Sequence, residues 1–517
     1  MNGAQALIRT LVEAGVDVCF ANPGTSEMHF VAALDDVPQM RAVLTLFEGV
    51  ATGAADGYGR MAGRPAATLL HLGPGLGNGL ANLHNARRAR TPIVNVVGDH
   101  ATHHKRLDAP LESDIDALAG AVSGWVRRSL STADLAADAV DALAAAWAPP
   151  GCVATLILPA DVSWGEGGQL AAPPRRQGPA PVRPEVVREV GDALSTAAGP
   201  TVLLLGGDAL TEHGLLAAAR IAERTGARLL CETFPARLPR GAGLPFVQPL
   251  AYPPEPALAE LSGTRHLVLV GAREPVAFFA YPELPGTFTP PDCAVHALAE
   301  PGQDATEALC ALADRLAPDT APEVSEPARP ALPRGPLTPA ALADVLGALL
   351  PEGAIVVDES LTSGGHLHTA TKGCPRHDWL TLTGGAIGQG LPSAAGAAIA
   401  CPERPVIGIQ ADGSAMYTIT ALWTYAREQL DITTIICDNR SYAILAGELE
   451  RVGAASGGQR ARQLLELDRP DLDFVALAHG MGVPATRATT AEELADQLRQ
   501  ALAEPGPHLI DAVLQPE

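Results

Sequence analysis

Short apolar runs alternate with longer Ala-rich stretches along most of the chain. Near-continuous apolar strands that alternate with helices are typical of parallel sheets covered on both faces. The pattern therefore predicts an α/β fold with doubly wound parallel sheets. The predicted strands are residues 16–20, 42–47, 66–71, 93–97, 154–158, 201–205, 228–231, 266–270, 354–357, 406–410, 433–437 and 508–513.

Two Pro-rich stretches, at 165–184 and 318–339, interrupt this alternation. Neither has apolar periodicity, so neither would build a core. The chain of 517 residues is also well above the length of about 250 residues at which single cores stop growing. We therefore expect three α/β domains, at 1–165, 185–317 and 340–517. Ligands of such sheets bind beyond the carboxyl ends of the strands.

Charge and cysteine content disfavour several classes of protein. The 36 Lys and Arg residues against 58 Asp and Glu residues give a net charge of −22, and a surface this acidic repels nucleic acid. No apolar run approaches the roughly 18 residues of a membrane span, and the first residues lack a signal-peptide pattern. The eight cysteines are scattered without a C-x-x-C pair. We therefore expect reduced thiols in a cytoplasmic protein, without disulfides or a zinc site.

A strand–helix–strand unit in the last third carries informative polar residues. The run 406–410 precedes Asp412 and Gly413, a helix-like stretch covers 419–428, and the run 433–437 precedes Asn439. Because neighbouring parallel strands end at the same edge of a sheet, Asp412 and Asn439 should meet as hard oxygen ligands. Such ligands suit Mg²⁺ holding a diphosphate, which the backbone at Gly413 could approach closely. Taken alone, the triplet at 412–414 is more typical of a turn.

Together these residues resemble the motif of thiamine-diphosphate enzymes, in which G-D-G is followed at similar spacing by N-N. Ala411 replaces the first Gly of that motif, and Asp438 replaces the first Asn. The extra carboxylate at Asp438 could alter metal affinity. The resemblance implies Mg²⁺ ligands at Asp412, Asn439 and the backbone carbonyl of Ser441, and cofactor contacts at Gly413, Ser414 and Tyr442.

One carboxylate, Glu48, follows the run 42–47 at the start of a predicted helix. A Glu at that position could simply complement the helix dipole. However, the segments 48–65 and 71–78 resemble the family's activating-Glu helix and its G-P-G-x-x-N loop. The resemblance implies that Glu48 is the catalytic acid against the aminopyrimidine ring and that Gly75 and Asn78 contact the cofactor.

The same family resemblance names the domains as pyrimidine-binding, central and diphosphate-binding. It implies that the pyrimidine half of the cofactor is bound by one subunit and the diphosphate half by another. We therefore expect a homodimer or homotetramer with its active site at the subunit interface.

Within this superfamily the chain looks most similar to benzoylformate decarboxylases. Its segment 22–27 is similar to their substrate loop, and His71 falls on one of their catalytic His positions. The segment 384–388 matches the loop whose bulky wedge residue holds the cofactor bent. The resemblance implies catalytic roles for Thr25 and His71, and cofactor contacts at Asn22, Pro23, Gly24, Gly385 and Ile387.

These resemblances imply a Mg²⁺- and thiamine-diphosphate-dependent enzyme that decarboxylates a 2-oxo acid through a C2 carbanion and an enamine. One departure leaves the fate of the enamine open, because 274–281 has no His where benzoylformate decarboxylases carry a second catalytic one. The loop histidines His100, His103 and His104 are candidate replacements, or simply solvated. A carboligase of the acetolactate synthase type, a thiamine-dependent lyase on another substrate such as an acyl-CoA, and an inactive paralogue remain alternatives.

The middle segment adds two weaker signals. Acetolactate synthases bind FAD there, but the run 201–205 is not followed by G-x-G-x-x-G, which disfavours FAD. Phe278, Phe279 and Tyr281 could floor a substrate pocket or belong to a core.

Overall fold

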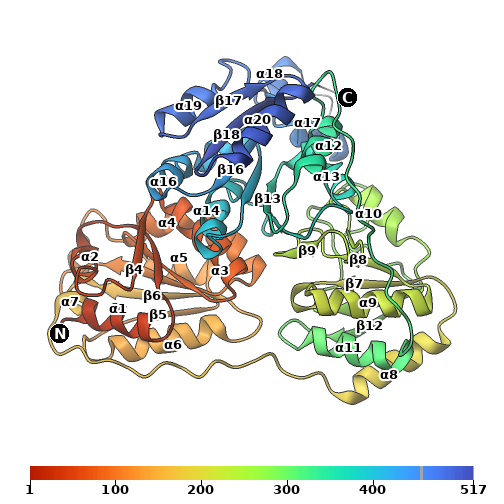
Figure 1. The fold of residues 1–517 in the computed structure, drawn as a ribbon. Helices are drawn as coiled ribbons and strands as arrows, with labels where there is room; N and C mark the ends of the chain where they lie inside the picture. The colour runs from red at the N-terminus through yellow and green to blue at the C-terminus, as the bar shows by residue number, and fades with distance from the viewer. Residues whose placement is uncertain (455–457, 516–517) are drawn as a thin grey trace.

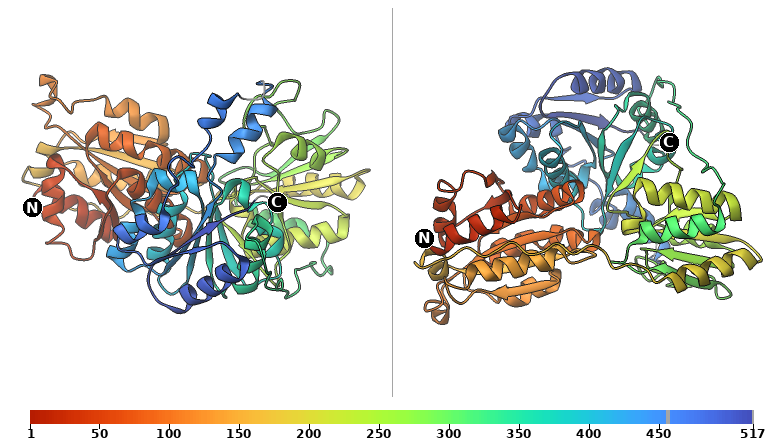
Figure 2. Two further views of the ribbon diagram at one scale, coloured as in Figure 1. Left: turned by 90° about the horizontal axis from the view of Figure 1, so that it is seen from above. Right: turned by 60° about the horizontal axis from the view of Figure 1, so that its bottom comes forward.

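The computed structural model describes residues 1–454 and 458–515 and contains three sheets, each with helices on its faces (Figure 1). The domain coloured red to orange and the domain coloured yellow to green lie on opposite sides of the third, which is teal to blue (Figures 1 and 2). The predicted fold class, three α/β domains built on parallel sheets, is confirmed.

The first sheet has six parallel strands in the order β2-β1-β3-β4-β6-β5. Its strands are β1 (Val18–Asn22), β2 (Arg41–Leu44), β3 (Ala66–Leu70), β4 (Ile93–Asp99), β5 (Trp125–Arg128) and β6 (Val153–Pro159). Its helices are α1 (Gly3–Glu13), α2 (Met28–Ala33), α3 (Glu48–Ala62), α4 (Leu72–Ala89), α5 (Ile115–Val122), α6 (Leu135–Trp147) and α7 (Ala160–Trp164), with 3-10 turns η1 (Thr25–Glu27) and η2 (Lys105–Leu107).

The middle sheet has five parallel strands in the order β10-β8-β7-β11-β12. Its strands are β7 (Thr201–Leu205), β8 (Arg228–Cys231), β10 (Gln248–Pro249), β11 (His266–Val270) and β12 (Ala294–Ala299). Its helices are α8 (Pro184–Thr196), α9 (Glu212–Thr225), α10 (Pro254–Leu261) and α11 (Ala305–Leu316), with the turn η3 (Gly207–Ala209).

The third sheet has seven strands in the order β17-β18-β16-β15-β13-β14-β9. Its strands are β9 (Leu238–Arg240), β13 (Ile355–Glu359), β14 (His377–Thr381), β15 (Val406–Ala411), β16 (Ile432–Asp438), β17 (Ala485–Ala488) and β18 (His508–Val513). Its helices are α12 (Pro339–Leu349), α13 (Leu367–Ala370), α14 (Gly390–Ala400), α15 (Asp412–Thr418), α16 (Ala421–Glu428), α17 (Ala443–Arg451), α18 (Gln459–Gln463), α19 (Phe474–Gly480) and α20 (Ala491–Ala503), with the turn η4 (Leu361–Gly364).

Strand β9 departs from the predicted organisation. It comes from the middle part of the sequence but pairs antiparallel with β14 in the third sheet, Leu238 opposite Trp379. A three-residue strand that pairs across more than a hundred residues leaves no local periodicity to detect. Both predicted linkers, 165–184 and 318–339, contain almost no helix or strand in the structure, although the domain limits themselves remain a prediction.

Two local expectations were wrong, and one short helix was missed. The run 42–47 ends as a strand at Leu44, because the chain turns before helix α3 begins at Glu48. The G-P-G segment is the first turn of α4 rather than a loop. The helix expected at 419–428 is present as α16, but a separate short helix before it, α15, begins at Asp412 and was not expected.

The first and third domains share one continuous core through helices α3 and α14. The two helices approach closely because each has a glycine at the contact. A methyl group at Gly396 would lie 1.9 Å from the carbonyl oxygen of Ala54, and one at Gly57 would lie 2.1 Å from that of Ser393. This contact fixes the helix that begins at Glu48 against the domain that contains Asp412.

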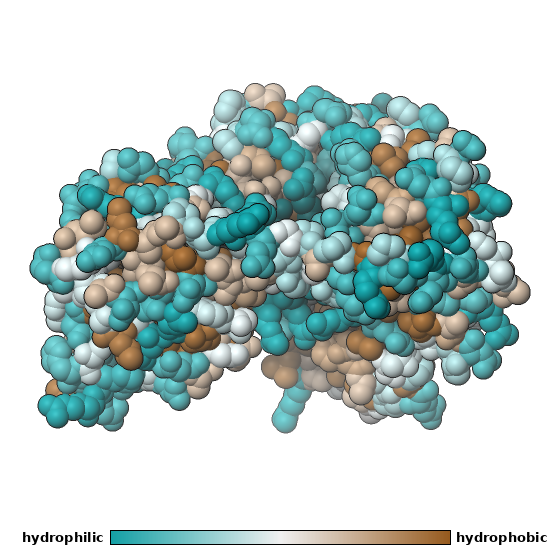
Figure 3. Space-filling model, turned by 90° about the horizontal axis from the view of Figure 1, so that it is seen from below, coloured by the Kyte–Doolittle hydropathy of each residue, from teal (hydrophilic) through white to brown (hydrophobic). Residues whose placement is uncertain are grey.

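The surface is consistent with the acidic composition. Hydrophilic residues dominate the face seen from below, and apolar residues form small separate patches (Figure 3). Among the described residues, no helix is both long and apolar enough to cross a bilayer. All eight cysteines are free.

Candidate active site

Glu48 lies at the N-terminus of α3, where a second helix closes over it. Only 6% of the residue is exposed. The Asn78 side chain on α4 donates a 3.0 Å hydrogen bond to Glu48 Oε2, and a methyl group at Gly75 would lie 3.0 Å from Glu48 Oε1. Glu48, Gly75 and Asn78 were predicted from two separate motifs, and the structure brings them together.

His71 lies at the end of β3 and is held by a buried carboxylate. Its Nδ1 is 2.8 Å from Oε2 of Glu27, which also accepts a 2.7 Å hydrogen bond from the Gly24 N–H. Burial raises the pKa of Glu27, while its bonds to His71 and Gly24 act in the opposite direction. The His71 side chain is 23% exposed, so it stays accessible while paired with Glu27. The Cβ of His71 also lies beside Gly75.

The segment 22–27 contains Glu27 and packs against His71. Asn22 is the last residue of β1 and is in register with Leu70, next to His71. A methyl group at Gly24 would lie 2.3 Å from His71 Nδ1, so the imidazole packs directly on the Gly24 backbone. Pro23 is half-buried, and Thr25 is exposed at the start of η1. Sequence reasoning gave Glu27 no role, because its partner is far along the chain.

Asp412 and the segment 438–442 meet at the carboxyl ends of β15 and β16. Asp412 is 2% exposed, and its Oδ2 is buried without a hydrogen-bond partner. Asn439 Oδ1 accepts a 3.0 Å hydrogen bond from the Ser441 N–H, which folds this turn toward Asp412. A methyl group at Gly413 would lie 2.3 Å from the Tyr442 ring. The structure thus brings together the predicted Mg²⁺ and diphosphate residues, including Ser414 in the first turn of α15.

Asp438 lies beside Asp412 and is also buried. Burial, together with the charge of Asp412, raises the pKa of Asp438 to about 6. Burial raises the pKa of Asp412 as well, against the N–H groups of Gly413 and 439–441. Two neighbouring carboxylates that both resist ionisation, one with an unpaired oxygen, fit the place of a divalent cation. The described residues contain no group of three or more His, Cys, Asp or Glu side chains for a metal, so amide and carbonyl oxygens would complete the ligands.

The loop that carries Ile387 is held by helix α4. Asn85 donates to the Ala386 carbonyl at 2.7 Å, and Asn82 donates to the carbonyls of both Gly388 and Gly49. Asn82 therefore connects the backbone next to Ile387 to the backbone next to Glu48. Ile387 is half-buried, and Gly385 is exposed at φ +74°.

The middle domain contributes aromatic rings beside this loop. Phe278 packs against Phe234 and Tyr252, with ring centroids 5.4 and 5.0 Å apart. A methyl group at Gly385 would lie 3.8 Å from the Phe278 ring. Phe279 is 59% exposed, whereas Tyr281 is buried. Burial, with Glu448 nearby, raises the pKa of Tyr281 to about 12.

The three loop histidines after β4 have partners of their own. The rings of His100 and His104 pack 5.5 Å apart, and His103 Nδ1 is 3.7 Å from Asp161. The His103 side chain is 72% exposed.

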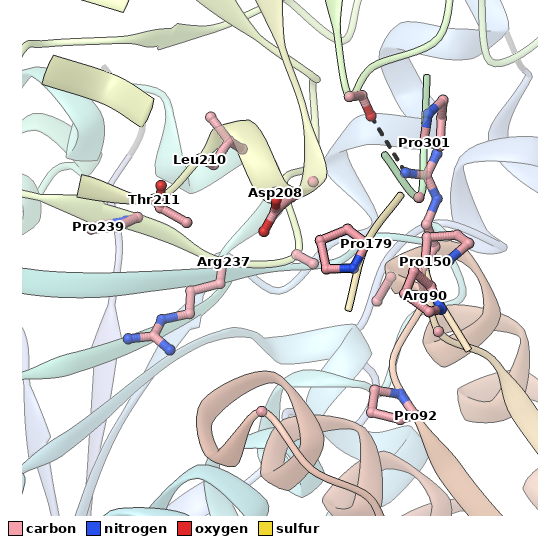
Figure 4. Close-up of a pocket in the computed structure, with 18 of the residues that line it drawn as sticks. Arg90, Pro92, Pro150, Pro179, Asp208, Leu210, Thr211, Arg237, Pro239 and Pro301 are labelled. Atoms are coloured by element: carbon pink, nitrogen blue, oxygen red, sulfur yellow. Dashed lines mark hydrogen bonds between the residues drawn. The ribbon is translucent and has the colours of Figure 1, made fainter. Parts of the chain in front are cut away.

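A cavity of about 780 Å³ lies where the three domains meet (Figure 4). It is lined in part by Asp208 in the turn after β7, which is the part of the middle domain expected to bind FAD if FAD were a cofactor. Arg90 donates to the Gly271 carbonyl at 3.4 Å, and Arg237 is paired with Asp378 at 2.7 Å. The turn reads Gly206-Gly207-Asp208, so FAD remains disfavoured as a prediction.

The chain matches two protein-family models. Residues 1–119 match the thiamine pyrophosphate enzyme N-terminal TPP binding domain, and residues 363–512 match the C-terminal TPP binding domain. Together these cover more than half of the chain. This protein belongs to the thiamine pyrophosphate enzymes. Thiamine pyrophosphate is the thiamine diphosphate of the sequence motifs, so the predicted family is confirmed.

Relatives of this thiamine pyrophosphate enzyme carry two kinds of name. A Mycobacterium tuberculosis protein described as putative acetolactate synthase large subunit IlvX is 64% identical over 516 residues, covering 99% of each chain. A Pseudomonas aeruginosa benzoylformate decarboxylase is 34% identical, covering 97% of this chain and 96% of the relative. The solved Rhodococcus jostii RHA1 thiamine diphosphate-dependent 4-hydroxybenzoylformate decarboxylase superimposes with a TM-score of 0.86 at 25% identity, and both chains are covered completely.

For a thiamine pyrophosphate enzyme, the extra carboxylate Asp438 makes a testable difference. Its folded pKa of about 6 is above the ordinary Asp value of about 4. Its contribution to stability is therefore present at low pH and is lost as pH rises through about 6. At neutral pH and without Mg²⁺, Asp438→Asn should raise the melting temperature, by about 2–4 °C for each kcal/mol of relieved charge burial and repulsion.

The same substitution should weaken Mg²⁺ binding, because a neutral amide attracts the ion less. Calorimetric titration and thermal melts at several pH values, with and without Mg²⁺, measure both effects. If Asp438→Asn lowered stability in the absence of Mg²⁺, the interpretation of Asp438 as an unfavourably buried charge beside Asp412 would be wrong.

Proposed function

We propose that this enzyme uses thiamine diphosphate and Mg²⁺ to decarboxylate a 2-oxo acid and release an aldehyde. The observation that carries the proposal is the arrangement around Gly75, where Glu48 and the Glu27-bound His71 adjoin the same backbone. The acid expected to serve the cofactor and the residue expected to serve the substrate thus both lie against the same glycine. The expected substrate loop 22–27 packs against His71 at Gly24.

When bound, thiamine diphosphate would supply the carbanion that attacks the keto carbon and would hold the electron pair after CO₂ leaves. The residues of this chain would bind it and move protons. Glu48, held by Asn78, would exchange a proton with the pyrimidine nitrogen. Asp412, Asn439 and Ser441 would hold Mg²⁺, with Gly413, Ser414 and Tyr442 around the diphosphate.

His71 is the proposed proton donor for product formation. With ionised Glu27 accepting from Nδ1–H, Nε2 is the nitrogen left for the substrate, and it donates a proton only from the protonated, imidazolium form of the ring. Thr25 and Asn22 flank this position on the substrate loop. Ile387 and Gly385 would contact the cofactor from the third domain. We further propose that the enzyme works in the cytoplasm as a homodimer or homotetramer.

An acetolactate synthase-type carboligase is the second candidate. The observation that favours it is the segment 274–281, which is mostly apolar and contains no His. Its Phe278 ring lies beside Gly385 of the Ile387 loop. Without a second proton donor, attack on another carbonyl would compete better with release of the aldehyde. The 64% identical relative is named as a putative acetolactate synthase subunit, in agreement with this alternative.

Product ratios separate the two candidates. The enzyme would be incubated with Mg²⁺, thiamine diphosphate and either pyruvate or benzoylformate, and CO₂, free aldehyde and acyloin or acetolactate would be measured separately. We expect aldehyde to dominate at every concentration of added acceptor. A ratio of ligated product to aldehyde that rises well above one with acceptor would establish the carboligase instead.

A His71→Ala variant tests the proton donor. We expect aldehyde release to slow by about 10²-fold or more, the lower range for general acid catalysis, while CO₂ release in a single turnover changes much less. Quenched-flow measurement of both products checks this. His103→Ala, which removes an exposed loop histidine, is the matched control. If His103→Ala gave the larger effect, the donor would be assigned to that loop.

A further inference from the structure

Glu359 is a buried carboxylate for which the sequence motifs gave no role. It is the last residue of β13 and is 2% exposed. Its Oε1 accepts a 2.6 Å hydrogen bond from the Gly388 N–H, and its Oε2 accepts from the Gly390 N–H and, at 2.9 Å, from Gln410 Nε2. Burial raises the pKa of Glu359 to about 7, although these donors lower it.

The backbone that Glu359 binds immediately follows Ile387. Gly388 has φ +94°, a conformation that favours glycine. A methyl group there would lie 2.6 Å from Tyr417 Cβ, so this turn has no room for a residue with a side chain. The Gly388 carbonyl in turn accepts from Asn82 of the first domain and, at 2.9 Å, from Thr418 Oγ1. The peptide groups around Gly388 are therefore bound on both sides.

Glu359 is also connected to the proposed diphosphate turn. The Gln410 side chain that donates to Glu359 also donates to Ser414 Oγ, and Ser414 Oγ is 3.0 Å from the Ala411 carbonyl. Two side chains therefore span the distance from the Ile387 loop to the start of α15. Gly390 makes this approach possible, since a methyl group there would lie 2.2 Å from Gln410 Oε1.

We propose that Glu359 is a positioning residue of the active site, which sets the Ile387 loop through the N–H groups of Gly388 and Gly390 and the Ser414 turn through Gln410. The inference rests on the proposed function. Its physical basis is that the ionised carboxylate, the form that the surrounding donors favour, presents only acceptor oxygens to them, whereas an amide in the same place turns an NH₂ group toward one of them. A buried donor left without an acceptor is costly, so the loop would move away.

The first measurement is amide hydrogen exchange on the full chain without cofactor, by mass spectrometry with residue-level fragmentation. In the wild-type protein, the amides of Gly388 and Gly390 should be protected. In Glu359→Gln, exchange across 384–391 should rise by about tenfold or more, the change expected for loss of a hydrogen bond to a charged group. Asp358→Asn is the matched control, because Asp358 is on the same strand but bonds Ser360 and Trp379 instead.

The second measurement is the rate of C2-proton exchange of bound thiamine diphosphate, followed by NMR at saturating cofactor and Mg²⁺. Glu359→Gln should slow this exchange by about tenfold while cofactor affinity changes less, because the loop is displaced but Asp412 and Asn439 remain. Glu359→Asp, which keeps the charge at shorter reach, should recover part of the rate. Asp358→Asn should leave the rate unchanged.

Several results would overturn the inference. Unprotected Gly388 and Gly390 amides in the wild-type protein would do so without any variant, which covers the case in which Glu359→Gln fails to fold. Equal increases of exchange throughout the chain, or in Asp358→Asn, would make Glu359 an ordinary core residue. Wild-type protein without any C2-proton exchange would contradict the proposed function, while leaving the amide result to judge the role of Glu359 in the loop.

Discussion

Glu48→Gln is expected to keep thiamine diphosphate bound and to slow turnover by about 10²–10⁴-fold, the range of general acid–base contributions. The amide is close in size to the carboxyl group and can still be held by Asn78, so the site should keep its shape. It cannot exchange a proton with the pyrimidine nitrogen. Cofactor affinity by calorimetry, C2-proton exchange by NMR and steady-state CO₂ release measure the three parts of this expectation.

The control for this variant is Glu13→Gln, an exposed Glu at the end of α1 in the same domain. It should behave as the wild-type enzyme in all three measurements. A Glu48→Gln enzyme with more than half of the wild-type turnover would remove Glu48 from the mechanism.

Asp412→Ala should abolish Mg²⁺-dependent cofactor binding, with affinity falling by more than about 100-fold. Even residues that only support metal ligands cost about 10–100-fold when mutated, and this change removes a ligand and a charge together. The unpaired, buried Oδ2 of Asp412 is the structural reason for the large effect. Cofactor titrations with Mg²⁺ and with EDTA isolate the metal-dependent part.

Asp496→Ala is the matched control, because Asp496 is an exposed carboxylate on α20 that pairs with Arg499 across one turn. It should leave cofactor affinity unchanged. Unchanged affinity in Asp412→Ala would instead place the metal site elsewhere and disprove the motif assignment.

The parts of the fold that could be predicted are those with continuous local patterns. The strands at 201–205, 228–231, 266–270 and 508–513 were predicted with their observed limits, since each is an apolar run between polar turns. Strand β14 was missed because it reads His-Asp-Trp-Leu-Thr, and its polar residues are satisfied by distant partners such as Arg237 and Arg404. These ion pairs form only in the folded chain, so a short stretch of sequence does not reveal them.

The same distinction holds for the site. Glu48, Asp412 and Asn439 could be found because each follows a strand in a recognisable motif. Glu27 and Glu359 lie in or beside predicted segments, but their roles depend on His71 and on Gly388, which only the folded chain brings near. A buried carboxylate with distant partners has no sequence signature of its own.

Strand β9 has a practical consequence for recombinant fragments and chimeras. A fragment that starts at α12 would lack residues 238–240 and would leave β14 as an open edge, with its unpaired backbone groups available to other chains. It would also lose the Arg237–Asp378 ion pair and the Arg240 guanidinium over the Trp379 ring. Exchanging the third domain between relatives by cutting at the 318–339 segment would therefore mismatch this border strand. A swap that carries 238–240 along with 340–517 keeps the sheet edge intact.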